Sequence, residues 1–224
     1  MWDDSTSASA ARSTSGMKRF ERSNTVTDDG SSPALPPLLE LVDRLERRQP
    51  DLNEHGARVG AYAEAIAQEM GLPAPAVARV RLAARLHDIG KSWIAPEILE
   101  KPGPLNEVEW MQIRRHPGVG ARLLKTAELH ELADIVMAHH ERPDGTGYPY
   151  GVPARELPLE GQIVAVADVY DAMLSPRSYA VTRNPDEARA ELERVASTQF
   201  DSHVVAAFLR VLDATPARVA AGSS

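Results

Sequence analysis

The stretch that decides the fold is RLAARLHDIGK, which covers residues 81–91. Its apolar residues continue a pattern with helical spacing that starts near Pro75 and ends at the pair His87-Asp88. A second pair, His139-His140, ends another segment with the same spacing. Imidazole and carboxylate groups are common metal ligands. Two neighbouring pairs at the ends of separate predicted helices therefore indicate a metal site.

The spacing within each pair predicts how many ions this site holds. Adjacent residues on a helix point about 100° apart, so we expect a neighbouring pair to serve two ions lying side by side rather than one. Asp88 would bridge the two ions through its two oxygens, while His87, His139 and His140 supply neutral nitrogen. The alternative is that His87 and Asp88 cap a helix and that the second pair lies on a surface. The occurrence of both pairs favours the multinuclear site.

Such a site predicts phosphoester hydrolysis. Water held between two metals about 3.5–4 Å apart becomes hydroxide near neutral pH and can attack phosphorus. Lys91 follows His87 by four positions and shares its face if the helix continues through Gly90. There it would stabilise the leaving oxygen or the phosphate.

The composition predicts one soluble, all-α domain. The chain has 224 residues, of which 43% are hydrophobic, 25% charged and 5% aromatic. It contains no cysteine, so any metal must be held by nitrogen and oxygen. The net charge of -7 argues against a broad basic face for duplex DNA or RNA. We find neither an apolar run of membrane-spanning length nor a signal peptide, and we expect a cytoplasmic protein without a membrane partner.

The order of segments predicts a helical bundle with one functional loop. Residues 1–35 are small and polar and are expected to form a disordered tail, residues 36–216 the domain, and residues 217–224 a frayed end. Between 141 and 158, several turn-forming residues predict a loop, with a short hairpin as an alternative. Helices are expected over residues 36–45, 54–70, 75–87, 107–115, 117–126, 130–140, 159–174, 186–196 and 201–212, with a break over 94–104.

Four short motifs together resemble the HD-GYP family of bacterial phosphodiesterases. They are HDIGK at 87–91, HHE at 139–141, DG at 144–145 and GYP at 147–149. An HD dipeptide alone is a weak signal, whereas the ordered combination is specific. The resemblance implies an HD-domain helical bundle with the GYP loop over a metal centre of two or three divalent ions, commonly iron or manganese. It also implies hydrolysis of cyclic di-GMP to pGpG or onward to GMP.

The resemblance also implies roles for individual residues. It implies that Lys91 lies near the metals and that Lys91 and Asp88 are the catalytic residues. The implied contacts to the substrate phosphates are Gly147, Tyr148 and Arg177. The implied metal ligands are His55, His87, Asp88, His116, His139, His140 and Asp168.

Two positions depart from the family pattern. Asp51 stands where members with a third metal have glutamate, so a third ion stays open and two are expected. Ala180 stands where a basic phosphate contact is common, which predicts weaker substrate affinity. Arg177, without the resemblance, is equally well read as an exposed structural arginine.

Without the resemblance, the sequence supports Asp168 as a metal ligand more strongly than it supports His55 or His116. Asp168 lies in an apolar run, where an acid is costly to bury without a cation. Asp171, three positions on, would orient a ligand or Lys91, or else lie on a solvated helix face. His55 alone fits a cap or surface position, and His116 fits the start of a helix.

The sequence thus predicts a metal-dependent cyclic di-GMP phosphodiesterase. One alternative is a related phosphohydrolase acting on another cyclic dinucleotide or on a nucleotide. A second alternative, of a different class, is a signalling interaction module with little turnover that recruits partners through the GYP loop. A signalling protein or a second copy of the chain is the partner we consider.

Overall fold

The computed structural model describes residues 50–175 and 182–214, and these fall within one unit of the chain. The predicted tail at 1–35, the expected helix at 36–45, Arg177, Ala180 and the expected frayed end at 217–224 lie outside the described residues. So does the side chain of Asp51, although its backbone is helical.

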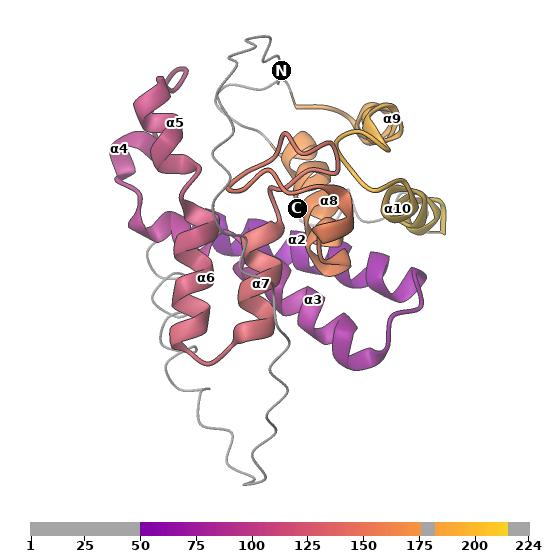
Figure 1. Cartoon of the computed structure of the whole chain (residues 1–224). Helices are drawn as coiled ribbons and strands as arrows, with labels where there is room; N and C mark the ends of the chain where they lie inside the picture. Colours follow the sequence, from indigo (N-terminus) through magenta and orange to yellow (C-terminus); the bar gives the residue numbers. More distant parts are fainter. Residues whose placement is uncertain (1–49, 176–181, 215–224) are drawn as a thin grey trace, which may run out of the picture. The chain divides into compact units, whose positions relative to one another are not determined.

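The described residues form helices joined by turns, without a strand (Figure 1). The fold class predicted from the sequence is therefore confirmed. The helices are α2 (Pro50–Glu69), α3 (Ala74–Leu86), η1 (Ile89–Trp93), α4 (Pro96–Leu99), α5 (Glu107–Ile113), α6 (His116–Thr126), α7 (His130–Ala138), η2 (Ala154–Glu156), α8 (Leu159–Leu174), α9 (Pro185–Val195) and α10 (Ser202–Ala214).

Most of these bounds agree with the predicted ranges, and α8 matches its range at both ends. Two expectations about irregular segments were wrong. The break over 94–104 contains α4, and the loop over 141–158 contains the short helix η2 in place of a hairpin. Both elements span a single turn or less, which is too short to show a periodic apolar pattern.

The core lies between α2, α3, α7 and α8, which contact one another in pairs, while α6 packs beside α7 (Figure 1). Tyr62 of α2, Tyr170 of α8 and Phe208 of α10 form an edge-to-face cluster with ring centroids 4.8–5.6 Å apart. Such pairs add about 0.5–1.5 kcal/mol each beyond the burial of apolar area. This cluster ties the carboxyl-terminal helix to the two helices that carry His55 and Asp168.

The chain turns sharply after α3, and this turn positions the HD pair. The helix ends at Leu86, one residue before its predicted end at residue 87, and the 3-10 helix η1 follows, so the condition under which Lys91 would share the face of His87 is not met. The reason is packing: a Cβ atom on Gly90 would collide with the backbone carbonyl of His116 in α6. Glycine therefore allows η1 to lie directly on the start of α6.

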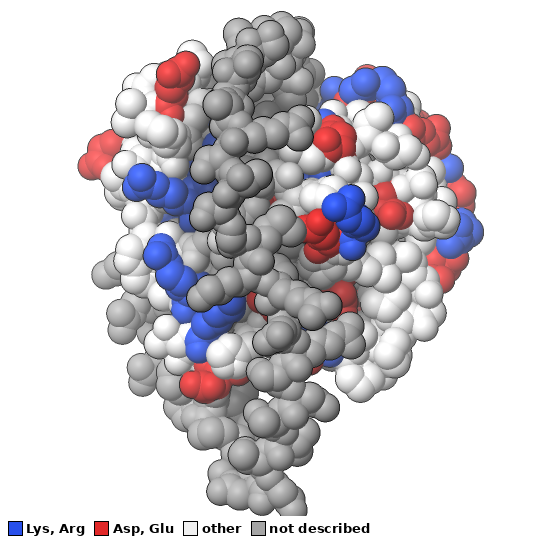
Figure 2. Space-filling model, viewed as in Figure 1, with Lys and Arg blue, Asp and Glu red and all other residues white. Residues whose placement is uncertain are grey.

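Charges over the carboxyl-terminal helices are mixed. Figure 2 shows basic and acidic side chains side by side over α9 and α10. Arg189 pairs with Asp213 at 2.8 Å, and Arg194 pairs with Glu191 at 2.7 Å. Exposed pairs of this kind contribute about 0–1 kcal/mol to stability. Within the described residues, no helix has the length and apolar character needed to cross a bilayer.

Candidate metal centre

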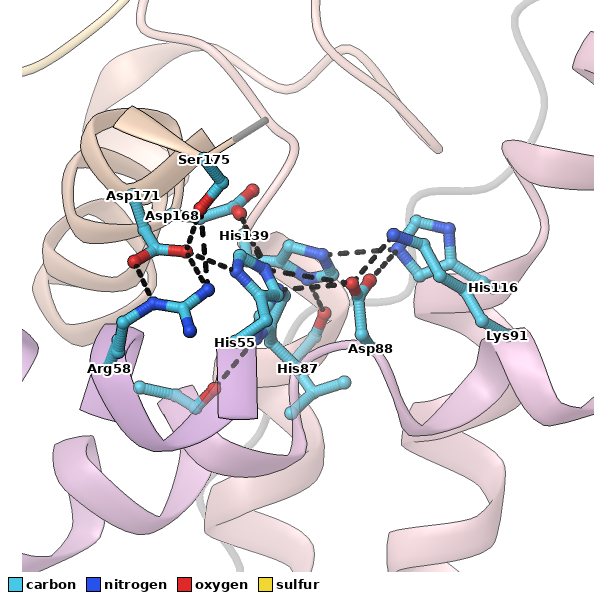
Figure 3. Close-up of polar contacts among 12 residues, drawn as sticks. His55, Arg58, His87, Asp88, Lys91, His116, His139, Asp168, Asp171 and Ser175 are labelled. Atoms are coloured by element: carbon cyan, nitrogen blue, oxygen red, sulfur yellow. Dashed lines mark hydrogen bonds and ion pairs between the residues drawn. The ribbon is translucent and has the colours of Figure 1, made fainter. Parts of the chain in front are cut away.

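The ends and inner faces of separate helices bring the seven predicted ligand positions together, and all of them except His140 are labelled in Figure 3. Helix α2 supplies one histidine, and the turn after α3 supplies the HD pair. Helix α6 supplies its first residue, the turn after α7 supplies two histidines, and α8 supplies an aspartate. The seven residues are His55, His87, Asp88, His116, His139, His140 and Asp168. Their role as ligands stays a prediction, and their proximity is what the structure contributes.

The seven residues form two groups that share Asp88. In one group, ligand atoms of Asp88, His116, His139 and His140 all lie within 4.8 Å of one another. In the other, the same holds for His55, His87 and Asp88. Asp168 belongs beside the second group, because its Oδ1 lies 3.2 Å from His55 Nε2 and 3.7 Å from His87 Nε2.

The two histidines after α7 lie close together, and which ion each of them would bind stays a prediction. His139 and His140 belong to the same group, with ring centroids 4.1 Å apart and planes tilted by 42°. The 100° rule holds inside a helix, but α7 ends at Ala138, and both histidines lie in the turn beyond it. Asp88 is the residue that both groups contain, so it is the candidate for a ligand shared by the two ions.

Three of the histidines are oriented by the backbone of the preceding turn. Nδ1 of His87, His116 and His139 lies 2.6–2.7 Å from the carbonyl oxygen three residues earlier in each case. A carbonyl can only accept, so Nδ1 must carry the hydrogen, and in its neutral form each ring has its lone pair on Nε2. This is the tautomer in which imidazole binds a metal through Nε2.

These lone pairs point at one another with no donor between them. His116 Nε2 lies 3.2 Å from His139 Nε2 and 3.2 Å from Asp88 Oδ1. His87 Nε2 and Asp88 Oδ1 are buried without a hydrogen-bond partner in the structure. Buried acceptors facing acceptors are costly unless a cation lies among them. The donor set therefore fits divalent metal ions.

Burial keeps two of the ligands neutral, whereas neighbouring cations keep a third one charged. It lowers the pKa of His140 to about 3 and that of His139 well below its usual value. For Asp88, burial alone would raise the pKa, but Lys91 and His87 outweigh it and hold the pKa well below the usual carboxyl value. Neutral imidazole and ionised carboxylate are the forms that bind a metal.

His55 differs from the other histidines because side chains orient it. Its Nδ1 lies 2.7 Å from Asp171 Oδ2, so its Nε2 faces Asp168. Burial alone would lower the pKa of His55, but its hydrogen bonds to Asp168 and Asp171 raise that pKa to about 9. A metal ion bound at His55 Nε2 must therefore displace a proton.

Asp171 is buried, with 1% of its surface exposed, so the alternative of a solvated helix face was wrong. It contacts His55 and Arg58 and no other cation in the described residues, so it orients a ligand and not Lys91. Lys91 instead donates to Asp88 Oδ2 at 2.6 Å. The lysine reaches the centre from η1, three residues after the aspartate, rather than along the face of α3.

The loop that carries the GYP motif lies over His140. The ring of Tyr148 stacks on that of His140, with centroids 4.6 Å apart and planes tilted by 32°. A Cβ atom on Gly147 would collide with the backbone of His140, Glu141 and Arg142, so only glycine allows this approach. The loop thus places a tyrosine against a candidate ligand.

Three residues around this centre had no role predicted from the sequence. Glu141 is buried and accepts hydrogen bonds from the backbone nitrogens of Tyr150 at 2.7 Å and Val152 at 3.2 Å, which ties down the loop. Arg114 lies over the Tyr148 ring at 6.0 Å, and Arg58 binds Asp171. Only Glu141 had a sequence signal, because it completes the HHE motif.

Comparison with known proteins agrees with this geometry. The sequence profile of the HD domain family matches residues 41–204, which include all seven candidate ligands. The chain belongs to the HD domain family. The resemblance to HD-GYP proteins that the motifs indicated is confirmed by relatives of this HD domain.

Two curated relatives share the HD domain of this chain. A cyclic di-GMP phosphodiesterase of Thermotoga maritima is 41% identical over 178 residues, which is 78% of this chain and 48% of that protein. The 3'3'-cGAMP-specific phosphodiesterase 3 of Vibrio cholerae is 35% identical over 173 residues, which is 77% of this chain and 38% of that protein. The chain thus spans less than half the length of these two relatives.

A solved structure shows the same fold. Bd1817, an HDG"Y"P protein from Bdellovibrio bacteriovorus, has a TM-score of 0.61 and 20% sequence identity. The match covers 78% of this chain and 56% of that one. The HD-domain helical bundle predicted from the sequence is confirmed.

Metal binding is expected to stabilise this HD domain. The facing acceptors repel one another in the metal-free protein, and an ion that binds only the folded state adds RT ln(1 + [L]/Kd). At 100-fold excess over Kd this is about 2.7 kcal/mol, or roughly 5–11 °C in Tm for a domain of this size. Thermal unfolding of chelator-treated protein, with and without Mn²⁺, measures the shift. Mg²⁺, which binds nitrogen ligands weakly, serves as the control ion. A Tm that Mn²⁺ leaves unchanged would count against a metal centre.

Proposed function

We propose that this chain is a metal-dependent phosphodiesterase that hydrolyses cyclic di-GMP to pGpG or GMP. The observation that carries the proposal is the pair of ligand groups joined by Asp88, because adjacent metal sites suit phosphoester hydrolysis. The name of the Thermotoga maritima relative supports the substrate. Asp88 and Lys91 are the residues to which we assign catalysis.

We propose two divalent ions, with Asp88 as the shared ligand. His116, His139 and His140 complete one site, and His55, His87 and Asp168 complete the other. When bound, the ions would polarise water and neutralise charge on the phosphate. Nitrogen and oxygen ligands without thiolate suit iron or manganese, which are the metals we propose. A third ion would need Asp51 as a ligand, and two ions are the number we propose.

The chain's own residues would then position the dinucleotide. Lys91 Nζ, which contacts Asp88, is placed to compensate charge on a phosphate oxygen. Arg114 has no ion pair among the described residues and lies over Tyr148, where its guanidinium is available to a second phosphate. Tyr148 offers a ring and a hydroxyl, and Gly147 allows the close approach of the loop. Arg177 is proposed as a further phosphate contact.

We propose residues 36–216 as the catalytic domain, flanked by the segments 1–35 and 217–224, in a cytoplasmic protein. The match of the family profile to residues 41–204 supports the central part of this range. A signalling protein or a second copy of the chain is the partner proposed. The acidic net charge of -7 supports the expectation that duplex DNA or RNA is not a ligand.

Hydrolysis of cyclic di-GMP by anaerobically purified protein, loaded with iron or manganese, tests the function. We expect turnover to pGpG or GMP, resolved by chromatography, with about two ions per chain in elemental analysis. A panel with 3'3'-cGAMP and cyclic di-AMP tests the alternative substrate, which the name of the Vibrio cholerae relative favours. Turnover of another dinucleotide alone would overturn the substrate assignment.

The interaction-module alternative gives a different result with two variants. If hydrolysis is the function, Asp88→Ala removes the cellular output while a partner still binds. If recruitment through the loop is the function, Tyr148→Ala removes the output and Asp88→Ala leaves it intact. Cyclic di-GMP levels and partner pull-down in the same cells distinguish the two readings.

A further inference from the structure

Arg58 bridges two helices next to the candidate metal centre (Figure 3). It lies on α2, three residues after His55, and its guanidinium reaches α8. Nε donates to Asp171 Oδ1 at 2.7 Å, and Nη2 donates to Asp171 Oδ2 at 3.0 Å. A third bond runs from Nη2 to Ser175 Oγ at 3.3 Å. The two bonds to Asp171 form the fork-to-fork geometry that only arginine makes.

The Asp171 carboxylate transmits this geometry to His55. Its Oδ2 lies 2.7 Å from His55 Nδ1 and also accepts from Ser175 Oγ at 3.2 Å. With both oxygens of Asp171 engaged by Arg58, the plane of the carboxylate is fixed. The ring of His55, whose Nε2 faces Asp168 and Asp88, is fixed in turn.

This arrangement makes the two ligand groups unequal. His87, His116 and His139 are oriented by carbonyls of their own turns, which no side-chain substitution removes. His55 alone among these four depends on a chain of side chains that ends at an arginine with 45% of its side chain exposed. The group that contains His55 can therefore be loosened without disturbing the other group.

We propose that Arg58 is a positioning residue that sets the metal affinity of the group formed by His55, His87, Asp168 and Asp88, acting through Asp171. The proposal rests on the proposed metal centre. It assigns a function to a residue that contacts neither the metal ligands nor the reacting atoms. Outer contacts of this kind change metal affinity by about 10–100-fold.

Titration of chelator-treated, full-length protein with Mn²⁺ alone tests the proposal. Free Mn²⁺ measured by electron paramagnetic resonance gives the number of sites and the affinity of each. We expect Arg58→Gln to weaken one site by about 10–100-fold and to leave the other unchanged. Arg58→Lys keeps the charge but loses the fork, and is expected to recover only part of that loss.

A matched control separates positioning from general loss of stability. Arg210 also bridges two helices, since its Nε lies 2.6 Å from Glu69 Oε1, and its side chain is 57% exposed. Neither residue touches a candidate ligand, so Arg210→Gln should leave both Mn²⁺ affinities unchanged. Thermal unfolding of the metal-free variants checks that each one is folded.

The possible outcomes are distinct. Loss of affinity at one site only, in Arg58→Gln and not in Arg210→Gln, supports the proposal, and Asp171→Asn should then add little to Arg58→Gln. Equal weakening of both sites, or of neither, overturns it. Wild-type protein that binds fewer than two ions overturns it together with the metal centre. Wild-type protein that binds two ions without hydrolysing cyclic di-GMP overturns the proposed function and leaves this inference standing if the site-selective loss is seen.

Discussion

Replacing Asp88 with alanine is expected to reduce hydrolysis of cyclic di-GMP by about 10³-fold or more. Metal ions in two-metal sites contribute several kcal/mol to the transition state, and 1.36 kcal/mol corresponds to tenfold in rate. Asp88 is the only residue that both ligand groups of the described chain contain, so its loss weakens both sites at once. The measurement is turnover of cyclic di-GMP beside an elemental metal count on the same preparation.

The structure offers a matched control for this variant. Asp134 lies on α7, pairs with Lys125 at 3.6 Å and has 47% of its side chain exposed. An exposed pair contributes about 0–1 kcal/mol to stability, so Asp134→Ala should change turnover by less than about twofold. Asp88→Ala protein that keeps its metals and its turnover would contradict the assignment of Asp88 as the shared ligand.

Replacing Gly90 with alanine is expected to lower the free energy of unfolding by about 2 kcal/mol. A Cβ atom at this position would collide with the carbonyl oxygen of His116 and would lie 2.8 Å from the backbone nitrogen of Gly120. Backbone atoms cannot rotate away as a side chain can, so η1 must separate from α6. The same shift would move Asp88 relative to His116. Thermal unfolding of metal-free protein should show a Tm lower by roughly 4–8 °C.

Gly118 provides the comparison, because it lies in the first turn of α6 and a Cβ atom there would meet no atom within 4 Å outside the backbone of its own helix. Alanine is favoured over glycine in a helix by up to about 1 kcal/mol, so Gly118→Ala should keep or raise the Tm. Equal losses in the two variants would mean that the close approach of Gly90 to α6 does not matter for stability.

Long helices were predictable where their apolar spacing is regular and their ends carry strong signals. Residues 159–174 begin after a proline and contain an apolar run, and the structure has α8 over the same residues. Prediction failed for α4, which has four residues and buries none of them. The end of α3 was predicted to within one residue, but the close approach of Gly90 to α6 depends on tertiary contact and not on any local propensity.

The sequence by itself determined the helical class, the family, and the positions that converge as candidate ligands, because the motif residues and their order are local features of the chain. Only the tertiary structure decided how those residues divide into two groups. His139 and His140 lie in one candidate group because α7 ends before them, and no spacing rule carries that information. Likewise, Asp171 orients His55 rather than Lys91 because α2 packs against α8. Such contacts join residues more than a hundred positions apart, where the direction of each side chain is set by helix packing rather than by its neighbours in sequence.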